Sequence, residues 1–278
     1  MELLDGKKIK LDKIEELKKE INKLERKPGI VVIQVGNDSA SNVYVKSKEK
    51  AALELGCNFE HIKFDENTSE DVILGKIDKL NDDNKVDGII VQMPLPGNFN
   101  TSKIQNRVSP KKDIDGLTDI NAGLLFHNKD TIVPCTPKGI MEMLDYYNIK
   151  VSGKHVVIVG RSELVGRPLM SLMLNNNATV TICHSYTSNL KEICKSADIL
   201  IAAVGKKHMI TKDMVKNGAV VIDVGINRED GKLYGDVDFD NVKDIVDYIT
   251  PVPGGVGQMT VLALYQNLLK AYRLNNYK

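Results

Sequence analysis

Short runs of β-branched residues alternate with longer segments of helical periodicity along nearly the whole sequence, and no other feature limits the fold as strongly. Strands that are separated by helices pair in parallel sheets through crossover connections, so the alternation predicts an α/β fold. A chain of 278 residues is also longer than one ordinary core requires. We therefore predict two α/β domains.

The alternation restarts in the middle of the chain. In the first half, strands are expected at 30–35, 57–64 and 87–92, with helices at 39–55 and 69–80. Turn-rich segments at 93–97 and 111–116 follow, and then a connecting helix at 136–147. In the second half, we expect buried strands at 155–159, 179–183, 199–203 and 220–224, and a last helix at 259–272. This last helix follows a glycine-rich loop, and we expect it to return to the first domain.

Composition excludes several classes of protein. A hydrophobic share of 42% and a charged share of 27% are those of a folded globular chain. The net charge of +1 comes without a basic cluster, so nucleic acid is not expected as a partner. No apolar run reaches the length of a membrane span, and the first residues lack the apolar stretch of a signal peptide. We expect a cytoplasmic protein that does not bind membranes.

Cysteine and histidine are scattered rather than paired. The four cysteines form no CxxC motif, and the five histidines show no HxxxH or HExxH spacing. A structural zinc site usually takes its ligands from such close pairs, so no metal site is predicted. We expect the cysteines to be reduced and to pack as small hydrophobic side chains.

A glycine ends the strand at 155–159. Gly160 and the following Arg161 and Ser162 precede a predicted helix, and such a turn lets a pyrophosphate approach the amide groups of the helix N-terminus. The segment lacks the GxGxxG pattern, so an ordinary tight turn between strand and helix explains Gly160 equally well.

The end of the next strand bears on the choice of nucleotide. An NAD site would place an acidic residue there to hold the ribose 2′-hydroxyl, but the strand ends in Cys183, His184 and Ser185. Arg161 and Ser185 can instead flank a 2′-phosphate, which favours NADP over NAD. His184 by itself is more typical of a surface histidine than of a ligand.

Several polar residues are expected at one edge of the first sheet. Tyr44 and Lys48 are four positions apart on a predicted helix, so their side chains share a face. Gln92 ends a strand at the same edge, and Asp115 lies in a polar turn that can fold over it. Each residue also has an ordinary structural explanation, such as a packed tyrosine or a solvated lysine. Their convergence on one edge favours a functional site.

The segment from Thr250 to Thr260 contains two prolines and three glycines within seven residues. Such a loop before a helix suits the close approach of backbone to a flat ligand. A simple linker would be more polar.

Six ordered motifs are spread over essentially the whole length of the chain. They are Ser41-Asn-Val-Tyr-Val-Lys-Ser-Lys48, Gly88-Ile-Ile-Val-Gln-Met-Pro-Leu-Pro96, Lys112-Asp-Ile-Asp-Gly-Leu-Thr118, Pro134-Cys-Thr-Pro-Lys-Gly139, Gly160-Arg-Ser-Glu-Leu-Val-Gly-Arg-Pro168 and Thr250-Pro-Val-Pro-Gly-Gly-Val-Gly257. Through these motifs the chain resembles the bifunctional methylenetetrahydrofolate dehydrogenase/cyclohydrolase family. One difference is that Gln258 stands where that family usually has proline.

This resemblance implies a folate-binding catalytic domain, at 1–118 with the returning helix 259–278, and a Rossmann-like NADP-binding domain at 119–258, with a cleft between them. It also implies a homodimer that acts on tetrahydrofolate derivatives. In the family, Lys48 is the central catalytic residue, Tyr44 positions the pterin, Gln92 contacts the lysine, and Asp115 hydrogen-bonds the pterin. The resemblance further assigns the folate to Val91, Met93, Pro253, Gly254, Gly255 and Val256, within a loop at 251–259, and NADP to Gly160, Arg161, Ser162, Ser185 and Ile226.

The implied chemistry is oxidation of 5,10-methylenetetrahydrofolate with NADP and hydrolysis of the methenyl product to 10-formyltetrahydrofolate. Oxidation depends mainly on alignment, whereas hydrolysis needs a group that accepts a proton. A free lysine is protonated at neutral pH, but apolar surroundings and a nearby cation favour the neutral amine. Glutamine suits such a lysine, because a carboxylate would stabilise the charged form.

Three alternatives remain open at this point. A short-chain dehydrogenase also uses a YxxxK pair, but there the glycine loop precedes the tyrosine, whereas Tyr44 precedes Gly160 here. A monofunctional NAD-linked methylenetetrahydrofolate dehydrogenase would share the fold, and the missing acid after the second strand disfavours it. A folate- or nucleotide-binding module without catalysis would not require Lys48.

Overall fold

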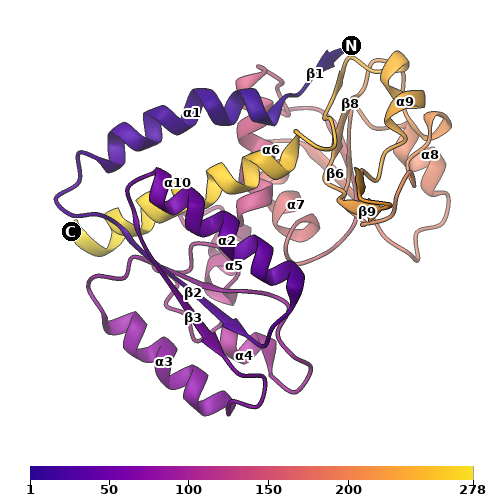
Figure 1. Ribbon diagram of the computed structural model, residues 1–278. Coiled ribbons are helices and arrows are strands. Elements are labelled where there is room, and N and C mark those ends of the chain that lie inside the picture. Colours follow the sequence, from indigo (N-terminus) through magenta and orange to yellow (C-terminus); the bar gives the residue numbers. More distant parts are fainter. Residues whose placement is uncertain (278) are drawn as a thin grey trace. The chain divides into compact units, whose positions relative to one another are not determined.

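The computed structural model describes residues 1–277 and divides into two compact units (Figure 1). Unit 1 comprises Met1–Asp12 and Thr136–Ala263, and unit 2 comprises Lys13–Cys135 and the chain from Leu264 onward. Each unit contains its own parallel sheet, so the predicted class, α/β with two domains, is confirmed. The predicted domain limits after residue 118 and before residue 259 stay a prediction.

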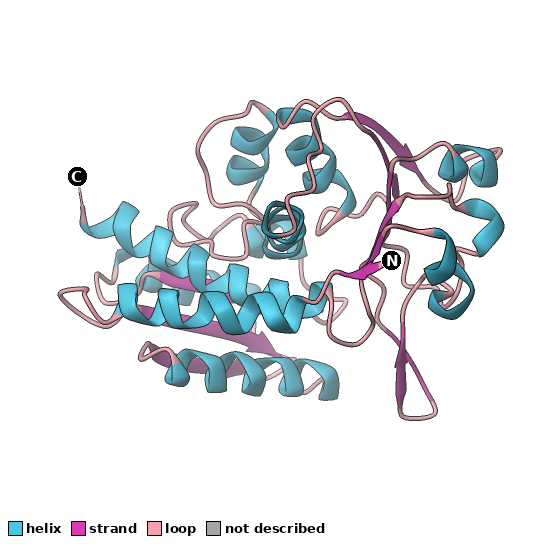
Figure 2. Ribbon diagram, turned by 90° about the horizontal axis from the view of Figure 1, so that it is seen from above, coloured by secondary structure: helices cyan, strands magenta, loops and turns pink. Residues whose placement is uncertain are grey.

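Unit 2 is built on a three-stranded parallel sheet in the order β3-β2-β4. Its central strand is buried along its whole length, whereas the edge strand β3 carries the charged residues Glu60 and Lys63, and charge on an edge strand keeps it from pairing with another chain. Helices lie on both faces of the sheet (Figures 1 and 2). The strands are β2 (Gly29–Val35), β3 (Asn58–Phe64) and β4 (Gly88–Val91), and the helices are α2 (Ser39–Glu54), α3 (Glu70–Asp82), α4 (Thr101–Gln105) and α5 (Asp119–Phe126).

The apolar residues of α3 explain how it covers one face of this sheet. Ile73, Ile77 and Leu80 recur at helical spacing and pack against Val31, Ile33 and other residues of β2 and β4. On the other face, a side chain at Gly88 would collide with Leu268, which belongs to the last helix, α10 (Val256–Asn276).

Unit 1 contains a six-stranded parallel sheet in the order β1-β11-β8-β7-β5-β6. Both faces of its central strands are buried, which explains their continuous runs of valine and isoleucine. The strands are β1 (Glu2–Leu3), β5 (His155–Val159), β6 (Thr179–Cys183), β7 (Ile199–Ala202), β8 (Val220–Asp223) and β11 (Tyr248–Ile249). A separate antiparallel hairpin consists of β9 (Asn227–Glu229) and β10 (Lys232–Tyr234).

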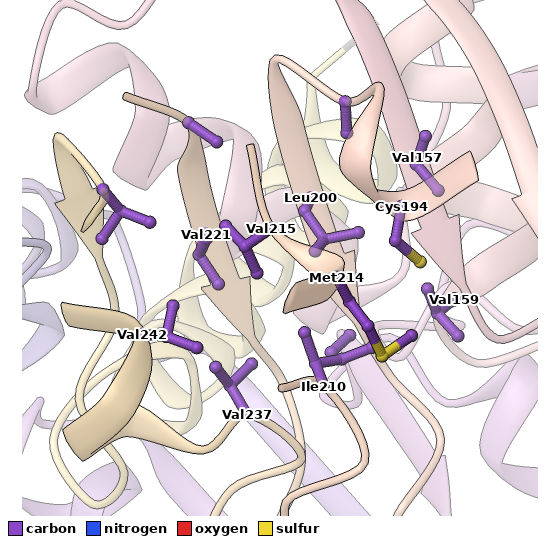
Figure 3. Close-up of a cluster of buried hydrophobic side chains, with 14 of the residues drawn as sticks. Val157, Val159, Cys194, Leu200, Ile210, Met214, Val215, Val221, Val237 and Val242 are labelled. Carbon is purple, nitrogen blue, oxygen red and sulfur yellow. The ribbon is translucent and has the colours of Figure 1, made fainter. Parts of the chain in front are cut away.

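One hydrophobic cluster fills a face of this sheet (Figure 3). Val157, Leu200 and Val221 project from three neighbouring strands toward Met214 and Val237 on the connecting segments. The helices of unit 1 are α7 (Gly166–Asn175), α8 (Leu190–Lys195) and α9 (Phe239–Val242), together with most of α6 (Cys135–Tyr146) and the ends of α1 (Gly6–Ile21) and α10 that fall within it. Two short 3₁₀ turns at Lys212–Met214 and Lys243–Ile245 complete it.

Candidate active site

Helix α2 carries Tyr44 and Lys48 on one face. It begins where the side chain of Asp38 accepts a hydrogen bond of 2.7 Å from the backbone amide of Ser41, which satisfies one of the free amides of the first turn. Tyr44 is 54% exposed, and Lys48, one turn later, is partly buried. The phenol ring is therefore open to a ligand, while the lysine stem packs against protein.

The structure joins Lys48 directly to Gln92. The Nζ atom of Lys48 donates to Oε1 of Gln92 at 3.1 Å, and Nε2 of Gln92 donates to the backbone oxygen of Met93 at 2.8 Å. The second bond fixes the orientation of the amide, because only the oxygen then faces the lysine. Gln92 follows Val91, the last residue of β4, and both are buried. Lys48 thus faces a neutral acceptor rather than a carboxylate.

The backbone of Lys48 is also held by a hydrogen bond from another helix. The hydroxyl group of Tyr265, on α10, donates a hydrogen bond to the backbone oxygen of Lys48. Tyr265 is completely buried. Burial raises the pKa of the Tyr265 hydroxyl, so it stays a donor.

Asp115 lies on a turn that a second acid organises. The carboxylate of Asp113 is completely buried and accepts hydrogen bonds from the amides of Gly116 and Thr118 and from Nδ2 of Asn121, at 3.0, 2.8 and 2.9 Å. Burial raises the pKa of Asp113, and the hydrogen bonds oppose this shift. Asp115 itself stays partly exposed, and is free to contact a ligand.

Two buried side chains flank the backbone of Asp115. The thiol of Cys135 lies 3.8 Å from Oδ1 of Asp115, and Nδ2 of Asn267 donates to the backbone oxygens of Ile114 and Val133 at 2.9 and 2.8 Å. These contacts fix Ile114, the residue before the aspartate, and join it to Val133. Our sequence prediction named neither Cys135 nor Asn267 as part of the site.

The predicted folate loop belongs to unit 1, and it is shorter than predicted. Helix α10 begins at Val256, so the residues from Val256 to Met259 are helical and only the part through Gly255 is a loop. Gly255, the last residue of the loop, is buried with no space for a side chain: an added Cβ would lie 2.5 Å from the backbone oxygen of Pro251. Pro253 is exposed and Gly254, with a φ of 110°, is partly exposed, so both can reach a ligand.

Gly160 directly follows β5 in a conformation that requires glycine. Its φ is 127°, and an added Cβ would lie 2.2 Å from the backbone oxygen of Ala203 on the neighbouring connection. Gly166 is equally constrained, because its Cβ would lie 2.1 Å from the oxygen of Gly160. The helix α7 therefore begins directly against the strand end, as a phosphate-binding turn requires. Ser162 is exposed, and its hydroxyl accepts from the amide of Val165 at 3.2 Å.

The end of β6 matches a nucleotide with a 2′-phosphate. Arg161 and Ser185 are both exposed, and Cys183, His184 and Ser185 supply no carboxylate that would repel a phosphate there. The guanidinium group of Arg161 lies 5.8 Å from the centre of the Tyr186 ring, a cation–π contact that orients it. The residues present therefore fit NADP.

Ile226 follows β8 and is 55% exposed. The backbone around it is held by two buried acids, Asp223 and Asp236, which our sequence prediction did not name as functional. Their only signal in the sequence is an acidic residue at the end of an apolar strand and another between Gly235 and Val237. Among residues 1–277, no group of three or more His, Cys, Asp or Glu side chains is arranged to hold a metal ion. In the same range, no helix is long and apolar enough to cross a membrane.

Two family models match the chain. The model for the catalytic domain of tetrahydrofolate dehydrogenase/cyclohydrolase matches residues 4–115, and the model for the NAD(P)-binding domain of the same family matches residues 134–276. Among curated proteins, the chain is 51% identical to the bifunctional protein FolD of Halalkalibacterium halodurans over 272 residues, which cover 97% of this chain and 98% of that protein. It is 50% identical to the bifunctional protein FolD of Bacillus cytotoxicus, with 97% and 96% covered.

Solved structures show the same family resemblance. The bifunctional FolD methylenetetrahydrofolate dehydrogenase/cyclohydrolase of Campylobacter jejuni superposes with a TM-score of 0.97 at 42% identity, covering 99% of both chains. The Trypanosoma brucei enzyme, whose structure holds NADP and an inhibitor, gives a TM-score of 0.94 at 33% identity over 100% of this chain and 99% of that one. The NAD-dependent dehydrogenase of Saccharomyces cerevisiae, at 22% identity and a TM-score of 0.81, shares the fold, with 97% of this chain and 96% of that chain covered.

Proposed function

Because this chain belongs to the tetrahydrofolate dehydrogenase/cyclohydrolase family, we propose that Lys48 and Gln92 are the catalytic pair of its hydrolysis reaction. The chain is a bifunctional oxidoreductase and hydrolase. It oxidises 5,10-methylenetetrahydrofolate to 5,10-methenyltetrahydrofolate with NADP, and hydrolyses this product to 10-formyltetrahydrofolate. The observation that carries the proposal is the hydrogen bond of 3.1 Å from Lys48 to a neutral amide.

Oxidation needs the folate to be held still. NADP, when bound, supplies the acceptor for the hydride. Tyr44 positions the pterin with its exposed ring, Asp115 accepts hydrogen bonds from it, and Val91 and Met93 support the same edge. Pro253 to Val256 contribute to folate binding, and Gly160, Arg161, Ser162, Ser185 and Ile226 to NADP binding. None of these roles needs proton transfer, since alignment alone supplies much of the rate.

Hydrolysis places a chemical demand on Lys48. The oxygen of a water molecule forms a bond to the methenyl carbon, and the first of its two protons leaves. The bond from that carbon to one nitrogen then breaks, the second proton moves from the oxygen to that nitrogen, and the C–O bond becomes the formyl C=O. A neutral amine at Nζ of Lys48 can take the first proton. Gln92 supports this role, because it holds the amine in place without stabilising its charged form as a carboxylate would.

The test replaces Lys48 with methionine, which keeps most of the stem and removes the amine. Hydrolysis, followed as decay of methenyl absorbance, should fall about 10²-fold or more, the scale for loss of a general acid–base group. Formation of NADPH should fall less. Lys46→Met, on the same helix but exposed, is the matched control and should leave both rates unchanged. Parental hydrolysis by Lys48→Met would show that the lysine is structural.

We further propose that the protein works in the cytoplasm as a homodimer, with a catalytic domain at 1–118 and 259–278 and an NADP-binding domain at 119–258. No disulfide bond joins the four buried cysteines, all of which lie within the described residues 1–277, as expected of a reducing compartment. Sedimentation of the purified chain would test the dimer.

A further inference from the structure

Two buried acids occupy the carboxyl edge of the sheet in unit 1. Asp223 ends β8 and is 3% exposed, and Asp236, just after β10, is fully buried. Burying a carboxylate costs free energy unless donors surround it, and burial raises the pKa of Asp223 to about 6. The groups that donate hydrogen bonds to these two carboxylates are amide N–H groups. Within residues 1–277, no basic side chain donates a hydrogen bond to either of them.

Asp236 gathers two loops around one carboxylate. Its Oδ2 atom accepts from the amides of Val204 and Gly205 at 2.7 and 3.0 Å, and Oδ1 accepts from the amide of Lys206 at 2.7 Å. Oδ1 also accepts from Nδ2 of Asn227 at 3.0 Å. Residues 204–206 form the connection after β7, and Asn227 directly follows Ile226. One side chain therefore fixes both connections relative to each other.

Asp223 fixes the same region from the sheet side. Its carboxylate accepts from the amides of Gly225, Asp236 and Val237 at 2.9, 2.8 and 2.9 Å. The packing leaves no free volume: a Cβ on Gly225 would lie 2.2 Å from Oδ1 of Asp236, and a Cβ on Gly235 would lie 1.8 Å from Oδ2 of Asp223. The two acids are thus linked through the backbone, and the segment that contains Ile226 is clamped between them.

The clamp also reaches the loop before α10. The backbone amide of Asp223 donates to Oγ1 of Thr250 at 2.7 Å, and Thr250 begins that loop. Farther along, a Cβ on Gly257 would lie 3.9 Å from Cδ1 of Ile226, an ordinary contact distance. The segment of Ile226 and the start of α10 therefore lie side by side within unit 1.

We infer that Asp236 and Asp223 are positioning residues for the dehydrogenase reaction, which act by holding Ile226 and its loop where the nicotinamide binds. The inference rests on the proposed contact between Ile226 and the cofactor. It explains why two carboxylates are buried here at a cost, since hydride transfer depends on alignment and a displacement of about 1 Å can lower the rate about 10²-fold. Hydrolysis makes no such demand on this loop.

Asp236→Asn tests the inference, because it replaces one acceptor oxygen with an NH₂ group that faces N–H donors. In the ligand-free chain, the amides of residues 204–206 should exchange with deuterium at least about tenfold faster. The kcat of the dehydrogenase should fall about 10- to 100-fold, whereas hydrolysis of added methenyltetrahydrofolate should stay within about threefold of the parent. Asp230→Asn is the matched control: it is exposed at the hairpin tip, with a φ of 49° that asparagine tolerates, and should change nothing.

A milder variant covers the case in which Asp236→Asn fails to fold. Asn227→Ala removes only one of the four donors to Asp236, and should lower the kcat of the dehydrogenase severalfold and leave hydrolysis intact. Equal losses of both activities, or faster amide exchange with an unchanged dehydrogenase, would overturn the inference. The outcome is independent of Lys48→Met, since that variant reports on hydrolysis and these report on oxidation.

Discussion

Unit 2 and unit 1 place their functional groups by different means. In unit 2, the groups that react are themselves the groups that contact each other: Lys48 reaches Gln92 across the carboxyl edge of a small sheet. In unit 1, the exposed residues Arg161 and Ile226 have few polar contacts of their own. Their positions are set by backbone packed too closely for side chains and, around Ile226, by amides that bind two buried carboxylates. The site of unit 2 depends on contacts between its reacting side chains, and that of unit 1 on how its backbone is packed and held.

This difference predicts different sensitivities to mutation. Substitutions in unit 2 that keep shape and change charge should alter chemistry and spare the fold. Substitutions in unit 1 that add a single methyl group should disturb the fold before they alter chemistry, because close-packed backbone has no room to relax. Variants in either unit can test this difference.

Gly160→Ala should have the largest effect. It puts a Cβ 2.2 Å from a backbone oxygen at a φ of 127°, where other residues are strained. We expect about 3 kcal/mol or more of lost stability, together with loss of NADP binding. Gly153→Ala is the control, since Gly153 has a φ of 74° but nothing within 4 Å of the added carbon, and should cost about 1 kcal/mol. Urea denaturation followed by circular dichroism measures both. Equal costs would mean that backbone strain alone, and not close packing, limits this position.

Arg161→Ala should have a smaller effect that is confined to the cofactor. Hydrogen bonds to a charged group contribute about 1.5–3 kcal/mol, so the Kd of NADP should rise about 10- to 100-fold, and that of NAD only slightly. The chain has no tryptophan, so the fluorescence of bound reduced nucleotide can be followed directly. Arg107→Ala, which removes the same charge from a surface ion pair in unit 2, is the control. Equal weakening of NADP and NAD would show that Arg161 does not contact the 2′-phosphate.

Most of the fold could be predicted from the sequence, because long buried strands carry their own pattern. Strands β5 and β6 have the predicted limits, and β2 and β8 differ by one residue at one end. The two-residue strands β1 and β11 were not predicted, since they are too short for any periodicity and exist only through pairing at the sheet edge. The hairpin β9–β10 was missed although Asp230-Gly231 is a typical hairpin turn.

Some residues of the candidate site could likewise be predicted from the sequence, and others could not. Lys48 and Gln92 could be placed together because parallel strands and the helices that follow them bring their ends to one edge. Asp223 and Asp236 could not be recognised as a pair, because their amide donors come from connections after two different strands and no sequence spacing encodes that meeting. A motif reveals which side chains are present, but residue types do not reveal which backbone amides will donate to a given carboxylate.

Gln92→Glu has the smallest expected effect and tests the comparison most directly. The change keeps the shape of the side chain and puts a negative charge about 3 Å from Nζ of Lys48. Such a neighbour stabilises the ammonium form, so less of the lysine can accept a proton. We expect hydrolysis at neutral pH to fall roughly tenfold, because the fraction of the lysine in the neutral form should fall by about the same factor. The dehydrogenase should change little, and thermal unfolding should show an intact fold. Because the defect is one of protonation, the rate of the variant should keep rising with pH after that of the parent has levelled off, so the loss should shrink at high pH. Gln92→Leu separates charge from the hydrogen bond: it removes the acceptor without adding charge, so any loss should be the same at every pH. If Gln92→Glu and Gln92→Leu lose the same rate with the same pH dependence, Gln92 only positions Lys48, and the site of unit 2 depends on shape as the site of unit 1 does.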